Sequence, residues 1–331
     1  MTAPPPPSGA TPEPGPTAPR TCYRHSDRET GVSCTRCERP ICPDCMVEAA
    51  VGFQCPTCVA EGRRAARTAR TTFGGRTVTR PYVTWTVLSL MAVGYLVQMG
   101  TADPVGSAAA SPLVRLFGML TYAYDPATGQ DIGVLGGEWY RLITAAFLHG
   151  GIFHLLFNGY ATYLLGTQLE RWLGHGRFLA LWGLGALSGS ALTLLVASYG
   201  FELSPLGGLP EPLTAQLSVP LNQLSIGASG AVFALFGAVF VLGRRLNLDL
   251  RAVGVLLAVN LVLTFLVPRI SWTGHIGGLI AGLLLGAVFA YAAGSAAQAS
   301  RRTLVHALLV AAYAALVLAL VFFVAPGLVL S

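Results

Sequence analysis

The sequence predicts an all-α polytopic membrane protein preceded by a small cysteine-rich domain. Of its 331 residues, 53% are hydrophobic and only 11% are charged, whereas soluble domains carry roughly 25% charged residues. Several apolar runs after residue 80 approach the ~20 residues that span a bilayer. All seven Cys lie before residue 60, so no disulfide is expected in the membrane part.

The composition divides the chain into four parts. Residues 1–20 are rich in Pro and lack an apolar core, which predicts a disordered tail without a cleavable signal peptide. Residues 21–60 form the cysteine-rich domain, 61–80 a basic juxtamembrane linker, and 81–331 the membrane domain. The linker holds six Arg, which predicts contact with anionic lipid of the bilayer. It has one aromatic residue, Phe73, and we expect no nucleic-acid partner.

Residues 21–60 contain four ligand pairs at one spacing: Cys22/His25, Cys34/Cys37, Cys42/Cys45 and Cys55/Cys58. Thiolate and imidazole groups at this spacing are typical zinc ligands, and eight of them predict two closed, structural Zn²⁺ sites. A disulfide framework is the alternative, but it requires an oxidising compartment and leaves one Cys unpaired. The short gap between the second and third pairs favours interleaved sites over consecutive ones.

This ligand pattern resembles a B-box-type zinc finger. The resemblance implies a binding module with a cytoplasmic protein partner, because filled four-ligand sites leave no position for a catalytic water.

Seven membrane spans are predicted at 82–100, 148–168, 178–200, 222–242, 252–268, 272–293 and 304–325. Cytoplasmic loops carry an excess of Arg. With a cytoplasmic N-terminus, only Arg115, Arg141 and Arg269 fall on the outer side, and the C-terminus is extracellular. We expect the long outer segment 101–147 to lie partly in the membrane interface, and the loop 201–221 also to lie outside.

Three polar residues on three separate predicted spans point to a reaction centre. Asn158, Ser229 and His275 fall in one layer, roughly 5–15 Å below the outer surface at 1.5 Å per helical residue. Ser229 lies between Gly227 and Gly230, and we expect it inside a helix. Helix packing through small residues is the alternative for this stretch.

Chemistry assigns roles to these groups. A serine hydroxyl needs a base, and imidazole is the usual one. The only acid in a predicted span or its rim is Glu170, so we expect a Ser229–His275 dyad. Asn158, backbone N–H groups near Ser229, and His154 one helical turn before Asn158 are candidate oxyanion donors. Phe233, one turn after Ser229, is a candidate to pack against the His275 ring.

The membrane domain resembles the rhomboid family of intramembrane serine proteases. The resemblance rests on five motifs in family order: Glu138-Trp-Tyr-Arg141, His149-(x4)-His154-(x3)-Asn158, Leu169-Glu-Arg-Trp-Leu-Gly174, Gly227-Ala-Ser-Gly230 and His275-(x2)-Gly278-(x3)-Gly282. It implies a six-helix core followed by a seventh transmembrane helix. It also implies that Ser229 is the nucleophile, that His275 is the base, and that His154 and Asn158 contribute to the oxyanion hole.

The implied activity is cofactor-free hydrolysis of peptide bonds in or near transmembrane segments, at an active site that opens to the outer side of the cell membrane. The alternative is a catalytically silent rhomboid-like protein that binds transmembrane segments, but such a protein typically lacks the serine or the histidine. A proton-coupled transporter needs intramembrane acids. Metalloproteases and aspartyl proteases of the membrane need His-Glu-x-x-His or intramembrane Asp, which this sequence lacks.

Overall fold

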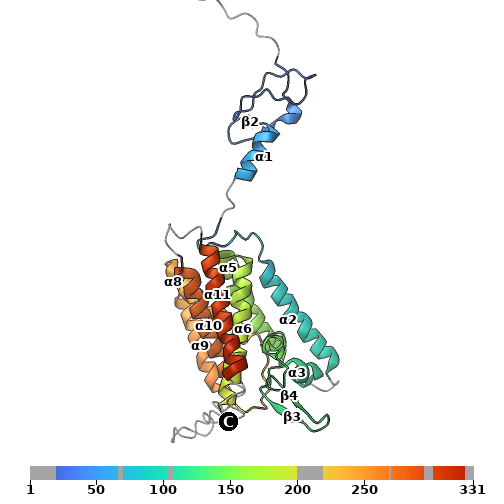
Figure 1. The fold of residues 1–331 in the computed structure, drawn as a ribbon, viewed down its shortest axis with the longest axis vertical. Coiled ribbons are helices and arrows are strands. Elements are labelled where there is room, and N and C mark those ends of the chain that lie inside the picture. The colour runs from blue at the N-terminus through green and yellow to red at the C-terminus, as the bar shows by residue number, and fades with distance from the viewer. Residues whose placement is uncertain are drawn as a thin grey trace, which may run out of the picture. The chain divides into compact units, whose positions relative to one another are not determined.

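The computed structural model describes residues 20–65, 70–102, 107–199, 219–267, 270–293 and 301–324. The chain forms two compact units, Met1–Thr68 and Ala69–Ser331 (Figure 1). The predicted disordered tail lies outside the described residues except for its last residue, and most of the predicted outer loop 201–221 also lies outside them.

The first unit is a small domain built around its cysteines. It contains a 3₁₀ turn at Pro43–Cys45, a two-stranded antiparallel sheet of β1 (Val47–Glu48) and β2 (Phe53–Gln54), and helix α1 (Pro56–Ala65). Its buried core consists of six Cys and Ile41. A core of this size cannot stabilise a fold without disulfides or metal, and the described cysteines are all free thiols.

The second unit is a helical bundle (Figure 1). Its long helices are α2 (Tyr82–Thr101), α5 (Ile152–Leu173), α6 (His175–Ser198), α8 (Ser229–Arg245), α9 (Arg251–Leu266), α10 (Trp272–Tyr291) and α11 (Arg302–Ala319), which continues as a π-helix at Leu320–Val324. Each overlaps one predicted span, so the helical fold class is confirmed.

Not every helix has the length of a full membrane span. Among the described residues, α2, α6, α10 and α11 are long and apolar enough to cross a membrane. The pair of Arg141–Phe147 and α5, bent by 98°, makes a fifth candidate, whereas α9 is apolar but shorter. The predicted count of seven spans therefore stays a prediction.

The predicted fourth span, 222–242, begins in the wrong place. Ser225 pairs with Met119 as an isolated β-bridge, and α8 begins only at Ser229. Gly227 between them has φ +124°, a conformation that favours glycine and cannot continue a helix. Ser229 is therefore the first residue of a helix. The apolar run predicts a position inside a helix, and that prediction is wrong.

Helices α6, α8 and α10 form the centre of the bundle and approach closely through glycines. A Cβ atom at Gly278 would overlap the carbonyl oxygen of Gly230, and one at Gly282 would overlap that of Ala234. Small residues permit this approach of α10 to α8. The two glycines of the His275-(x2)-Gly278-(x3)-Gly282 motif therefore serve the close packing of α10 against α8.

Among the described residues of the bundle, the one buried acid is Glu170, and its contacts hold two helices together. Its side chain is fully buried at the end of α5 and accepts hydrogen bonds from the backbone N–H groups of Val83 (2.9 Å) and Thr84 (2.8 Å) in the first turn of α2. The Thr84 hydroxyl (2.6 Å) and His175 Nδ1 (2.5 Å) also contact it. These contacts cap α2 with a carboxylate, which favours the helix N-terminus.

The segment before α5 is folded. It contains a 3₁₀ turn at Ala108–Ala110, α3 (Pro112–Phe117), the hairpin of β3 (Ala123–Asp125) and β4 (Gln130–Ile132), α4 (Arg141–Thr144) and a 3₁₀ turn at Ala145–Phe147. Several of its apolar side chains are exposed: Leu116, Phe117, Trp139, Tyr140 and Ile143. Exposed apolar groups of this kind are consistent with the predicted interfacial element.

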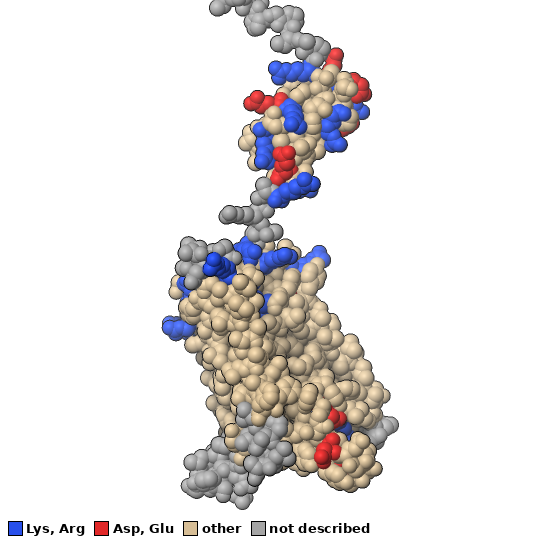
Figure 2. Space-filling view, viewed as in Figure 1, with Lys and Arg blue, Asp and Glu red and all other residues tan. Residues whose placement is uncertain are grey.

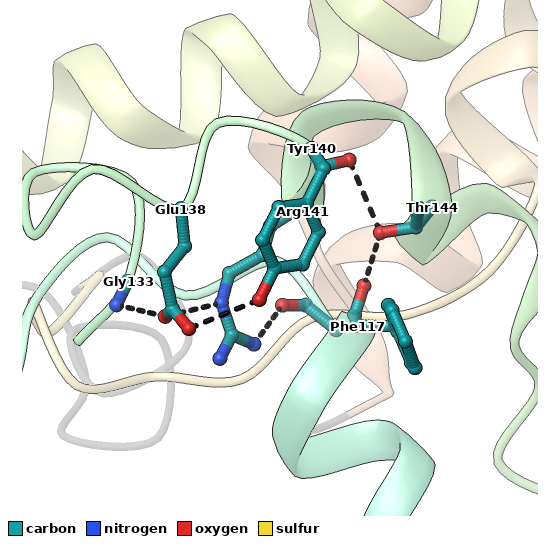
Figure 3. Close-up of polar contacts among 7 residues, drawn as sticks. Phe117, Gly133, Glu138, Tyr140, Arg141 and Thr144 are labelled. Atoms are coloured by element: carbon teal, nitrogen blue, oxygen red, sulfur yellow. Dashed lines mark hydrogen bonds and ion pairs between the residues drawn. The ribbon is translucent and has the colours of Figure 1, made fainter.

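An ion pair between the buried Arg141 and the partly exposed Glu138 fixes this segment (Figure 3). The side chain of Arg141 is almost fully buried, with its Nε 2.8 Å from Glu138 Oε2 and its Nη1 donating to the Gly118 carbonyl (2.9 Å). Burial acts to raise the pKa of Glu138, but hydrogen bonds from Arg141, the Gly133 amide and Tyr140 outweigh it and lower the pKa. Glu138 therefore stays charged at neutral pH and holds the turn into α4.

Candidate active site

Ser229 occupies the N-terminus of α8. The first intrahelical bond runs from the Val232 N–H to the Ala228 carbonyl (3.0 Å). The N–H groups of Ser229, Gly230 and Ala231 therefore have no partner within the helix, and the helix dipole is positive at this end. The serine hydroxyl thus lies beside backbone donors suited to a developing negative charge.

His275 is the fourth residue of α10 and its side chain is almost completely buried. Its ring stacks on Phe233 of α8, with ring centroids 4.1 Å apart and planes inclined by 17°. The expected Phe233–His275 contact is therefore confirmed. Because Phe233 lies one helical turn after Ser229, the stack brings His275 to the N-terminal part of α8.

The packing of α8 and α10 places the chain neighbours of Ser229 and His275 against each other. A Cβ atom added to Gly230 would lie 3.3 Å from the carbonyl oxygen of Gly274, so the neighbours of the two residues are in contact. Ser229 and Gly274 also line one small cavity of about 40 Å³, together with Ser190, Thr193, Ser225 and Ser271 among others. Among the described residues, no hydrogen bond joins Ser229 to His275, but catalytic hydrogen bonds are often long before substrate binds.

His154 lies against the segment that carries the serine. Its Nδ1 accepts a hydrogen bond from the Gly150 N–H (3.3 Å), so in the neutral ring the hydrogen is on Nε2. This Nε2 faces Gly227, where an added Cβ would lie only 2.6 Å away. His154 therefore presents an N–H donor beside the Gly227–Ser229 segment, and its part in an oxyanion hole stays a prediction.

Asn158 is buried on the same helix, but its described contact is local. Its Nδ2 donates to the carbonyl of His154, 2.9 Å away, within α5. One amide hydrogen is thereby used, and the other remains to serve a ligand. The position of Asn158 in the reaction stays a prediction.

Two polar residues that hold the site were not singled out from the sequence. Thr264 of α9 lies 2.6 Å from His275 Nδ1. Gln98 of α2 is fully buried, accepts from the His149 N–H (2.9 Å) and donates to the His149 and Ala108 carbonyls (both 3.1 Å). Each is one of several polar residues in its apolar run, and that position was the available signal.

The N-terminal unit brings the eight predicted metal ligands into two groups. In each group the candidate ligand atoms lie within 4.8 Å of one another, and the groups are Cys22, His25, Cys42 and Cys45, and Cys34, Cys37, Cys55 and Cys58. The interleaved arrangement is thus confirmed and the consecutive one is wrong. Each group has the four ligands of a closed tetrahedral site.

The surroundings of Cys34, one of these thiols, favour its thiolate form. Burial acts to raise the pKa of Cys34, but backbone N–H groups, foremost that of Cys55 at 3.2 Å, outweigh it and lower the pKa to about 6. A thiolate is the form that binds metal. The residues therefore fit a metal ion at each group.

The described residues form a helical membrane protein. Ser229 and the backbone donors lie at the start of α8, and His275 of α10 packs against the same helix. Residues 136–292, which include all four predicted catalytic residues, match the Rhomboid domain family. The rhomboid protein YdcA of Bacillus subtilis is 35% identical over 49% of this chain and 72% of its own length. The chain belongs to the rhomboid family and is a multi-pass membrane protein.

Two further relatives match this chain over different shares of their own length. Rhomboid protease GluP of Bacillus subtilis is 38% identical over 46% of this chain and 26% of that protein. RHOMBOID-like protein 5 of Arabidopsis thaliana is 28% identical over 63% of this chain and 68% of that protein. The Cys/His unit, α2 and α11 lie outside the range that matches the family domain.

Proposed function

We propose that this protein is an intramembrane serine endopeptidase that hydrolyses peptide bonds in or near the transmembrane segments of other membrane proteins. The observation that carries the proposal is the stacking of His275 on Phe233, one turn from a serine that begins a helix. The two rhomboid relatives of Bacillus subtilis described above support the same chemistry.

The proposed reaction follows from the groups at the site. His275 removes the proton from Ser229 Oγ, which attacks the substrate carbonyl and forms a tetrahedral oxyanion. The free N–H groups at the start of α8, with His154 and Asn158, stabilise this charge. His275 then protonates the leaving amine. Water next attacks the acyl group while His275 takes its proton, and His275 returns that proton to Ser229 Oγ as the acid product leaves. Only groups of this chain and water take part.

The charge distribution supports an orientation in the membrane. Figure 2 shows Arg residues gathered at one end of the bundle and an uncharged surface along its middle. Arg244 and Arg245 end α8 and Arg302 begins α11, whereas Ser229 lies at the other end of α8. By the positive-inside rule the Arg end is cytoplasmic. The N-terminus is then cytoplasmic, and the active site opens toward the outer side.

Cleavage of a single-span membrane protein tests this function. The purified protein is reconstituted in vesicles with a model substrate that carries distinguishable tags at its two ends, and the products are sequenced. We expect a cut near the outer end of the substrate segment. A substrate that binds and stays intact would favour the catalytically silent alternative.

Asn158→Ala should slow this cleavage without abolishing it, because His154 and the backbone donors of α8 remain. Loss of one oxyanion donor costs 10²–10³-fold in kcat elsewhere, and we expect a fall of about 10²-fold or less. The kcat of the purified variant measures it. An unchanged kcat in the double variant Asn158→Ala and His154→Ala would remove both residues from the mechanism.

We further propose that the N-terminal unit holds two Zn²⁺ ions and binds a cytoplasmic protein, with no role for nucleic acid. Zinc suits mixed thiolate and imidazole ligands, and such small units fold only with their metal. We expect metal analysis of the purified protein to return two zinc ions per chain. Cys22→Ser and Cys34→Ser should each lose one ion, since they belong to different groups. One ion or none in the unaltered protein would refute the two sites.

A further inference from the structure

Helix α9 contributes one buried side chain to the protein, and that side chain is Thr264. Across Arg251–Leu266 the other side chains are partly or fully exposed, many of them large apolar groups. Thr264 is fully buried, and its Oγ1 lies 2.6 Å from Nδ1 of His275. The one side chain that α9 buries therefore contacts the ring of the proposed base.

The hydrogen bonds of Thr264 determine which ring nitrogen of His275 carries a hydrogen. The hydroxyl donates to the Asn260 carbonyl in its own helix, 2.7 Å away. A carbonyl oxygen only accepts, and a hydroxyl has a single hydrogen. The Thr264 oxygen is therefore left to accept from His275, so the hydrogen of the neutral imidazole lies on Nδ1.

This tautomer leaves Nε2 of His275 with a free lone pair, which is the form a general base needs to take a proton from serine. In serine proteases with a triad, a carboxylate holds the histidine in this tautomer. Among the described residues of the membrane domain, no carboxylate contacts His275, and the buried acid Glu170 caps α2.

We propose that Thr264 is a positioning residue that replaces the missing acid and holds His275 in the Nδ1–H tautomer, a role that rests on the proposed protease function. Phe233 stacks on the face of the His275 ring, and Thr264 forms a hydrogen bond with Nδ1 at its edge. The hydroxyl comes from α9, whereas Ser229 and His275 belong to α8 and α10. A shift of α9 away from α10 would therefore release the base.

The test compares Thr264→Val, which keeps the shape and removes the hydroxyl, with Thr264→Ser, which keeps the hydroxyl. Steady-state cleavage of the model substrate gives kcat and KM for each. Misplacement of a catalytic group by about 1 Å costs ~10²-fold. We expect Thr264→Val to lower kcat by about tenfold to hundredfold with KM unchanged. Thr264→Ser should restore most of kcat.

A matched control is available at Thr162, a fully buried threonine of α5 whose hydroxyl has no hydrogen-bond partner among the described residues. Thr162→Val should leave kcat unchanged. A Thr264→Val variant as active as the unaltered protein would overturn the proposal. So would a Thr264→Ser variant as slow as Thr264→Val, because packing and not the hydroxyl would then be responsible.

A second readout does not depend on activity. In ¹⁵N-histidine spectra of the full-length protein, with His275 assigned by its loss in His275→Ala, we expect hydrogen on Nδ1 and none on Nε2. Hydrogen on Nε2 would overturn the proposal even if Thr264→Val proves unstable. If the unaltered protein cleaves nothing, the proposed function fails, while the spectrum still decides the role of Thr264.

Discussion

Ser229→Ala should abolish cleavage of the model substrate while the protein remains folded. The variant retains the backbone donors of α8 and the stacked His275, but it has no atom that can form the acyl-enzyme. Removing the nucleophile of a serine protease costs about 10⁶-fold in kcat. We therefore expect no product above background. His275→Ala should give the same result, since an unassisted serine hydroxyl is a weak nucleophile.

Two controls show whether Ser229→Ala loses activity through its chemistry or through unfolding. One is the thermal unfolding midpoint of the variant, and the other is a second serine variant. Ser198 of α6 is buried, and its hydroxyl has no partner among the described residues. Ser198→Ala should retain full activity. If Ser229→Ala cleaved at the rate of the unaltered protein, the serine mechanism would be wrong.

Gly278→Ala should cause the second large effect, on both stability and activity. The added Cβ would overlap the carbonyl oxygen of Gly230, and backbone cannot move aside as a flexible side chain can. Overpacking typically costs about 1–3 kcal/mol, and an overlap with backbone belongs at the upper end of that range. Because Gly278 lies one turn after His275, a shift of α10 by about 1 Å should lower kcat roughly a hundredfold.

Gly254→Ala on α9 is the matched control, because a Cβ there meets nothing within 4 Å. Its thermal midpoint should not fall, since alanine favours a helix over glycine. A Gly278→Ala variant with unchanged midpoint and kcat would show that α8 and α10 do not need this close approach.

The sequence predicted the helices well because their signal is local. Each long helix overlaps an apolar run, since a helix in lipid satisfies its own backbone. The interleaved metal groups also followed from spacing, because a short gap between two Cys pairs prevents both from folding onto one ion. The Phe233–His275 contact followed from one-turn spacing on a helix.

Other features depend on backbone conformation or distant contacts that no local pattern reveals. The apolar run 222–242 reads as one helix, and only the positive φ of Gly227 shows that α8 begins at Ser229. In the sequence Thr264 resembles any other small residue of a membrane span, and nothing near it indicates a contact with His275. Glu170 finds its partner Thr84 far away in the sequence, so its role as a cap appears only in the folded chain.

The central claim is that Ser229 is a nucleophile activated by His275. Labelling with a fluorophosphonate probe, followed by mapping of the modified peptide, tests it most directly and needs no native substrate. We predict one labelled residue, Ser229, in the unaltered protein and no label at this position in His275→Ala. A folded protein that remains unlabelled, or a label confined to another serine, would contradict this mechanism.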